Sequence, residues 1–129
     1  MIKQIKSSEI KDFIKENSNT VLLDVRTENE WKSLGRPKVE SLSSKTYFVT
    51  VSHDLSNWQV PDKNFVENVK KNINKDKKIL VMCAAGGRSM IAANLLETEG
   101  YSVLNVSDGY SGNGQDPGWK KLNLPIDNS

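Results

Sequence analysis

The segment Val81-Met82-Cys83-Ala84-Ala85-Gly86-Gly87-Arg88-Ser89 contains the single cysteine of the chain. An apolar run over residues 79–82 leads into the cysteine and is typical of a buried strand, while a helical pattern begins near Ser89. A thiol at the start of a short, glycine-bearing loop between a strand and a helix is well placed to act as a thiolate, because the N–H groups of a helix N-terminus favour a nearby negative charge. The sequence therefore predicts a nucleophilic cysteine at the carboxyl end of a strand.

The composition is that of one ordinary globular domain. The chain has 129 residues, 36% of them hydrophobic and 26% charged, and its net charge of +2 gives no reason to expect nucleic acid or an anionic membrane as a partner. A single cysteine excludes an internal disulfide, and one cysteine with one histidine cannot form a structural zinc site. No stretch approaches the roughly 20 apolar residues of a membrane span, and the N-terminus has no apolar signal-peptide core. We expect a single domain over residues 1–129, cytoplasmic and monomeric, without a metal or another cofactor.

Apolar runs alternate with amphipathic stretches along the chain. The predicted strands cover residues 1–6 (a short edge strand), 21–25, 47–51, 78–82 and 101–106. The predicted helices run from an N-cap at Ser7 or Ser8 to residues 17–19, and over residues 27–31, 64–73 and 89–99. This alternation predicts a three-layer α/β domain with a mainly parallel sheet, in which ligands bind at the carboxyl ends of the strands.

Charged residues follow the second predicted strand at its carboxyl end. Asp24 lies in a run that is expected to be buried, where a carboxylate destabilises the fold unless it is paired. Arg26 is an available partner, and Thr27 with Glu30 fits a helix capping box. Two interpretations of Asp24 and Arg26 follow: they support the cysteine loop, or they form a structural ion pair.

The loop after Cys83 is suited to a small anion. Ala84 and Ala85 add little bulk and no charge, and Gly86 and Gly87 allow backbone N–H groups to turn inward. Several N–H groups that converge on one point form an anion-binding nest. The alternative interpretation is a buried, inert cysteine before an ordinary strand-to-helix turn.

The spacing between cysteine and arginine limits the size of the anion. Arg88 adds a permanent positive charge, and Ser89 can cap the following helix. Tyrosine and dual-specificity phosphatases have five residues between the cysteine and the arginine, whereas this loop has four between Cys83 and Arg88. The shorter loop favours a persulfide over a phosphate group.

These motifs together resemble a single-domain rhodanese, a sulfurtransferase. The resemblance is carried by Leu22-Leu23-Asp24-Val25-Arg26 with Glu30-Trp31, by Cys83-Ala84-Ala85-Gly86-Gly87-Arg88-Ser89, by Ala92-Ala93, Leu96 and Gly100-Tyr101, and by Val106, Gly109, Gly112, Trp119 and Leu124-Pro125. It implies a rhodanese-like α/β fold, with a sheet of about five mostly parallel strands between helices, as one domain over residues 1–129.

The resemblance also implies an activity. Cys83 would take a sulfane sulfur from thiosulfate or from a thiol or protein persulfide, and pass it to cyanide or a thiol. The residues expected to bind the persulfide through their backbone amides are Ala84, Ala85, Gly86, Gly87 and Arg88, and those expected to support the loop are Ser89, Asp24, Arg26 and Glu30. Arg88 is expected to be held by Glu30 or Asp24.

Other functions stay open at this point. A catalytically weak rhodanese-like binding or regulatory module is one alternative, and a cysteine-dependent phosphatase or arsenate reductase is another. Because Ala84 and Ala85 supply no positive charge, thiosulfate is expected to be a poor donor. Trp31 and Trp58 are interpreted as packing residues, and residues 108–118 as a surface loop or a flap beside Cys83.

Overall fold

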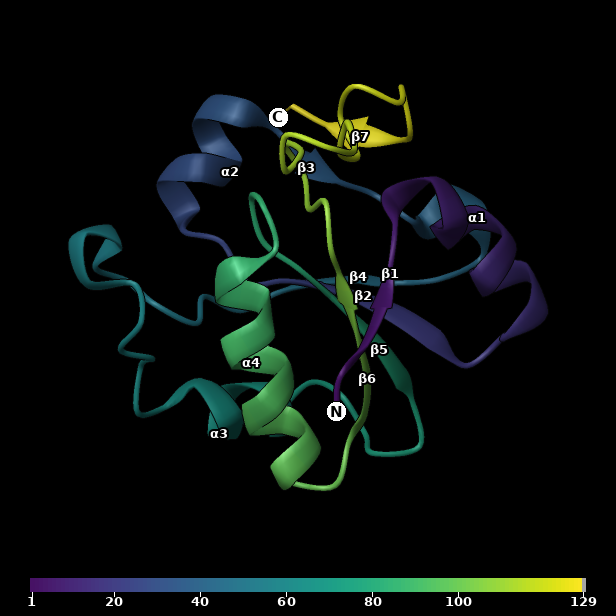
Figure 1. The fold of residues 1–129 in the computed structure, drawn as a ribbon. Helices are drawn as coiled ribbons and strands as arrows, with labels where there is room; N and C mark the ends of the chain where they lie inside the picture. Colours follow the sequence, from purple (N-terminus) through teal and green to yellow (C-terminus); the bar gives the residue numbers. More distant parts are fainter. Residues whose placement is uncertain (129) are drawn as a thin grey trace.

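The computed structural model describes residues 1–128 and contains a five-stranded parallel sheet with helices on both faces (Figure 1). The strands are β1 (Lys3–Ile5), β2 (Thr20–Asp24), β4 (Thr46–Phe48), β5 (Lys78–Met82) and β6 (Ser102–Val106). Their order across the sheet is β1-β6-β5-β2-β4, and every pairing is parallel. The predicted α/β fold with a parallel sheet is therefore confirmed.

Four helices and several short elements connect these strands. The helices are α1 (Ser7–Glu16), α2 (Glu28–Leu34), α3 (Phe65–Lys70) and α4 (Gly87–Thr98), and the 3-10 turns are η1 (Glu40–Leu42) and η2 (Leu55–Asn57). The two-residue strands β3 (Arg36–Pro37) and β7 (Ile126–Asp127) form a separate antiparallel pair, which the sequence did not indicate. Among the described residues, no helix is long and apolar enough to cross a membrane.

Two hydrophobic cores lie on opposite faces of the sheet. Successive strand side chains alternate between faces, so Leu23 and Val81 face α3 and α4, whereas Leu22 and Leu80 face α1. Figure 1 shows α3 and α4 on one side of the strands and α1 on the other. Each fully buried aliphatic side chain in these layers stabilises the fold by about 1.5–3 kcal/mol. Because both faces are covered, the central strands read as continuous apolar runs.

The start of α1 differs from the predicted cap. The N-cap of α1 is Lys6, whose backbone N–H donates to Glu9 at 2.8 Å, and not Ser7 or Ser8. The hydroxyl of Ser7 instead donates to Asp108 at 3.0 Å, a contact between distant parts of the chain that local patterns do not reveal. The prediction of a serine cap at this helix is wrong.

Two predicted boundaries also shift. Helix α3 ends at Lys70 and is followed by a turn at residues 71–72, although Ile73 is buried as its pattern predicted. Strand β4 ends at Phe48, beyond which Val49 and Val51 still donate to carbonyls of residues 24 and 25. Backbone hydrogen bonds between these two segments of the chain thus continue up to residue 51, beyond the ends of β4 and β2.

Candidate active site at the carboxyl end of β5

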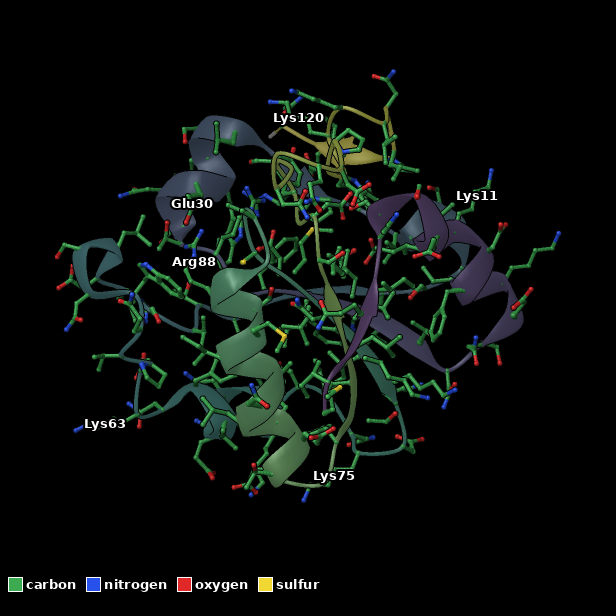
Figure 2. All side chains as sticks on the ribbon, viewed as in Figure 1. Lys11, Glu30, Lys63, Lys75, Arg88 and Lys120 are labelled. Carbon is green, nitrogen blue, oxygen red and sulfur yellow. The ribbon has the colours of Figure 1, made fainter. Side chains whose placement is uncertain are left out.

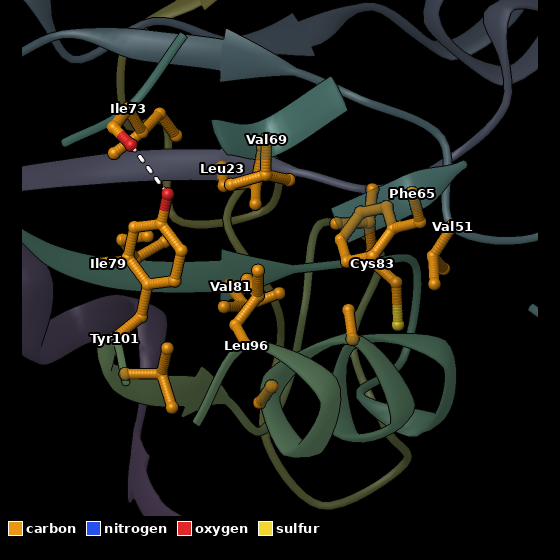
Figure 3. Packing of buried hydrophobic residues seen from close by; sticks show 14 of the residues in the cluster. Leu23, Val51, Phe65, Val69, Ile73, Ile79, Val81, Cys83, Leu96 and Tyr101 are labelled. Atoms are coloured by element: carbon orange, nitrogen blue, oxygen red, sulfur yellow. Dashed lines mark hydrogen bonds between the residues drawn. The ribbon is translucent and has the colours of Figure 1, made fainter. Parts of the chain in front are cut away.

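Cys83 directly follows β5, which lies between β2 and β6 near the middle of the sheet. Its side chain is only 1% exposed and packs beside Val51 and Phe65, at the end of the row of core side chains on this face (Figure 3). A position on a central strand holds the sulfur atom rigidly, because the strand is hydrogen-bonded on both edges. The sequence correctly indicated that the cysteine follows a buried strand.

The sulfur atom of Cys83 has two hydrogen-bond partners. The backbone N–H of Gly86 donates to Sγ at 3.2 Å, and the thiol donates to the Ser89 hydroxyl at 3.3 Å. The Ser89 hydroxyl in turn donates to Oδ1 of Asn105, whose Nδ2 donates to Gln4 at 2.8 Å. A chain of polar groups thus connects the thiol to the edge of the sheet. The Gly86 N–H is the one backbone donor among these contacts that points at the sulfur atom.

Ser89 does not cap α4, contrary to the sequence prediction. The N-cap is Gly86, and Ser89 lies in the first turn, fully buried against Asn105. The structure therefore places Ser89 beside the sulfur instead of at the helix end. Asn105 was not singled out from the sequence, since an asparagine in a strand carries no local signal for a contact with a distant loop.

Gly86 gives the loop its sharp turn. Its φ is +102°, in the left-handed region, and a Cβ atom there would lie 2.5 Å from the Ser107 carbonyl oxygen. Only glycine fits at this position without a backbone shift. The turn places the Gly86 N–H toward the sulfur and allows α4 to begin at once.

The segment after β6 fixes the loop from the core side. The N–H of Tyr110 donates to the Cys83 carbonyl at 2.8 Å, and the N–H of Ser111 donates to the Ala84 carbonyl at 2.9 Å. Residues 108–118 do not line the pocket that contains Cys83. The segment therefore lies beside Cys83, as one of the two interpretations expected, but it takes no part in the pocket lining.

Arg88 forms a two-pronged ion pair with Glu30 of α2. Its Nη1 and Nη2 atoms donate to the two carboxylate oxygens at 2.7 and 2.8 Å, and the two side chains are only 10% and 15% exposed. Figure 2 shows them pointing toward one another from α4 and α2. Burial by itself raises the pKa of Glu30, but hydrogen bonds from Arg88 and from the Thr27 N–H outweigh it and lower that pKa to about 2. Glu30 is therefore a carboxylate at neutral pH.

Glu30 is held in place by the start of its own helix. The Thr27 N–H donates to the Glu30 carboxylate at 3.1 Å and the Glu30 N–H donates to the Thr27 hydroxyl at 3.4 Å, which is the capping box expected from the sequence. The same carboxylate thus starts α2 and fixes Arg88.

Asp24 and Arg26 form a separate pair that does not reach the cysteine loop directly. Both side chains are fully buried, and the Arg26 guanidinium donates to the Asp24 carboxylate at 2.8 Å and to the Gly35 carbonyl at 2.9 Å. The guanidinium also stacks over the ring of Tyr110 at 4.0 Å. Of the two carboxylates proposed to hold Arg88, Glu30 does so, and the Asp24–Arg26 pair fits the structural interpretation.

A pocket of about 300 Å³ lies beside Cys83, which forms part of its lining. Its lining consists of Leu55, Trp58, Cys83, Ala84, Ala85, Gly87 and Arg88. Trp58 was interpreted from the sequence as a packing residue, yet it is partly exposed and forms one side of this pocket. Residues 52–61 are mostly polar, and the tryptophan and leucine among them were the sequence signal from which a contact with the pocket could have been inferred. Within residues 1–128, no group of three or more metal-ligating side chains could hold a metal ion.

Comparisons with known proteins agree with the α/β fold described above. The rhodanese-like domain family matches residues 7–115. An uncharacterised protein of Rickettsia prowazekii is 39% identical over 128 residues, which cover 97% of each chain. Thiosulfate sulfurtransferase 18 of Arabidopsis thaliana is 33% identical over 89 residues, 68% of this chain and 62% of that protein. A crystal structure of a protein from M. tuberculosis, 25% identical, superposes with a TM-score of 0.82 over 98% of both chains.

Proposed function

The chain belongs to the rhodanese-like domain family, and from this premise we propose that it is a sulfurtransferase that carries sulfane sulfur as a persulfide on Cys83. The observation that carries the proposal is that Cys83 lines a surface pocket while the Gly86 N–H is directed at its sulfur atom. The family includes sulfurtransferases, and one relative is named as such. A free thiol of this kind suits a reducing compartment, so we propose a cytoplasmic location.

In the first half-reaction Cys83 acts as the nucleophile. The thiolate attacks the outer sulfur of a donor such as thiosulfate, an S–S bond forms to Cys83, and the bond to the sulfite group breaks with its electron pair on sulfite. Gly86 stabilises the thiolate, and the N–H groups of the first turn of α4 lack intrahelical acceptors and favour negative charge nearby. No external oxidant or reductant is needed.

In the second half-reaction the persulfide is the sulfur donor. An acceptor such as cyanide or a thiol attacks the outer sulfur, the S–S bond breaks, and Cys83 is released as the thiolate. Arg88 lies in the pocket lining and offers positive charge to the anionic intermediate, while Glu30 fixes the orientation of its guanidinium. Arg88 and the loop amides therefore act on the reacting atoms, whereas Glu30 is a positioning residue.

Intact-protein mass spectrometry tests this function. After incubation with thiosulfate or an organic sulfane donor, the wild-type protein is expected to gain the mass of one sulfur atom, and to lose it again with formation of thiocyanate when cyanide is added. The control variant Cys83→Ser should gain no sulfur. Failure of every donor to load Cys83 would overturn the proposal, and Cys83-dependent hydrolysis of p-nitrophenyl phosphate would favour a phosphatase instead.

A further inference from the structure

A closed loop of residues 52–62 forms one side of the pocket beside Cys83. The Asp62 N–H donates to the Val51 carbonyl at 2.6 Å, and the Ser52 hydroxyl donates to the Trp58 carbonyl at 2.7 Å. The first hydrogen bond joins the two ends of the loop, and the second fixes the backbone at Trp58. The loop therefore presents Trp58 and Leu55 in a defined position, although both are at the surface.

Trp58 contacts the cysteine loop itself. A Cβ atom added to Gly87 would lie 3.2 Å from the Cη2 atom of the Trp58 ring, so the edge of the indole lies directly against the start of α4. Leu55 is 48% exposed and lines the same pocket. Together with Ala84 and Ala85 these side chains make the lining mostly apolar. Exposed apolar side chains gathered around a reactive sulfur are typical of a substrate site.

The charges around the pocket do not suit a dianion. Arg88 is the one charged residue in the lining, and its guanidinium is paired with both carboxylate oxygens of Glu30. Lys63, which follows the 52–62 loop, points away from the molecule (Figure 2). Thiosulfate carries two charges and no apolar surface, so it would gain little from Trp58 or Leu55. A donor with one charge and an apolar body would gain from both.

We propose that this pocket selects organic sulfane donors, with Trp58 and Leu55 as the residues that determine specificity for an uncharged aryl or alkyl group. The inference rests on the proposed sulfur transfer and assigns its substrate class. With an organic thiosulfonate, the Cys83 thiolate attacks the outer sulfur, the new S–S bond forms, and the bond between the two donor sulfurs breaks to release a sulfinate with its electron pair. The apolar group packs on the indole of Trp58 and the side chain of Leu55 during this step.

Donor competition in the cyanide assay tests the inference. The quantity to compare is kcat/KM for benzenethiosulfonate divided by kcat/KM for thiosulfate. This ratio does not depend on the fraction of active enzyme in each preparation. Trp58→Ala is expected to lower this ratio by about 10-fold, because the aryl group loses its apolar contact while thiosulfate loses nothing. The matched control is Val60→Ala, which removes an exposed apolar side chain of the same loop outside the pocket lining and should leave the ratio unchanged.

A second variant keeps the test valid if Trp58→Ala disturbs the loop. Leu55→Lys places a cation at the pocket mouth on an exposed residue, and should lower the ratio mainly by raising kcat/KM for thiosulfate. An unchanged ratio in both variants would overturn the inference while leaving sulfur transfer intact. Absence of sulfur on Cys83 with either donor would instead overturn the proposed function, so the two failures are distinguishable.

Discussion

The Asp24–Arg26 and Glu30–Arg88 pairs join the same two chemical groups in very different surroundings. The side chains of the first pair are 0% exposed, and its arginine also binds the Gly35 carbonyl and stacks on Tyr110. The side chains of the second pair are 10% and 15% exposed, and its arginine lines the pocket beside Cys83. The two arginines therefore have different neighbours: Arg26 is enclosed by protein groups, whereas Arg88 lines the pocket that Cys83 also lines.

The comparison indicates that the burial of each ion pair determines whether it contributes to the stability of the fold or to the position of its arginine. A fully buried pair stabilises the fold only as a complete unit, because either partner alone is an uncompensated charge in the interior. A pair at a pocket keeps contact with water, so its loss leaves the fold intact but releases the arginine from its position. Substitutions in these two pairs, and in one exposed pair of α2, test this distinction.

Asp24→Ala should have the largest effect, on stability. It leaves the buried Arg26 guanidinium without its carboxylate, so we expect the free energy of unfolding to fall by about 3–5 kcal/mol in urea denaturation. The double variant Asp24→Leu with Arg26→Met should recover much of this loss, because it removes the uncompensated charge. A loss in Asp24→Ala as small as that of a surface substitution would contradict the distinction.

Glu30→Ala should affect activity more than stability. Arg88 loses both hydrogen bonds to its carboxylate, so we expect kcat/KM for sulfur transfer to fall about 10-fold, or about 1.4 kcal/mol. The neighbouring Glu28→Ala removes an exposed carboxylate of the same helix and is the matched control. The interpretation of Glu30 as a positioning residue fails if turnover in Glu30→Ala equals that of the control.

Acid should remove the contribution of Glu30 in a defined pH range. Its pKa is about 2 in the folded protein against an ordinary 4.5, so the carboxylate stabilises the folded state fully above pH 4.5 and loses this effect as pH falls toward 2. The difference in unfolding free energy between the wild type and Glu30→Gln should therefore be constant from pH 5 upward and shrink below pH 4.5. A difference that stays constant down to about pH 2.5 would show that Glu30 titrates normally.

Lys32→Ala should have the smallest effect. Lys32 pairs with Glu28 on the exposed side of α2 at 3.1 Å, with side chains 67% and 71% exposed. Water and salt screen such a pair, so we expect a change of about 0.3–0.5 kcal/mol in urea denaturation and unaltered turnover. A loss of unfolding free energy as large as that of Asp24→Ala would mean that the contributions of the three ion pairs to stability do not follow their burial.

Local patterns sufficed for most of the fold. Apolar runs over residues 21–25 and 78–82 predicted strands buried on both faces, and the capping box at Thr27 predicted the start of α2. The errors arose where distant contacts outweigh local ones. The Ser7 hydroxyl donates to Asp108, which follows the neighbouring strand β6, and does not cap its own helix. The β3–β7 pair has two residues in each strand, too short for a periodic pattern.

The residues of the site likewise divide into those that local sequence predicted and those that depend on distant contacts. The loop from Cys83 to Arg88 could be read from spacing and glycine content, because one continuous segment builds it. Which carboxylate holds Arg88 depends on where α2 lies relative to α4, so the sequence left Glu30 and Asp24 as alternatives. Trp58 and Asn105 reach the loop from other parts of the chain; an apolar side chain in a polar stretch was the only signal for Trp58, and Asn105 had none.

The pairing of β1 has a consequence for synthesis on the ribosome. Lys3 lies opposite Leu104, so the partner of the first strand is made 101 residues later. At about 5–20 residues per second, a nascent chain spends roughly 5–20 s with β1 unpaired. Throughout that interval Ile2 and Ile5, which are buried in the finished protein, are available to chaperones or to other nascent chains. β1 thus joins the sheet only after β6 has been made, and substitutions in β1 should reduce the yield of folded protein more than they alter its activity.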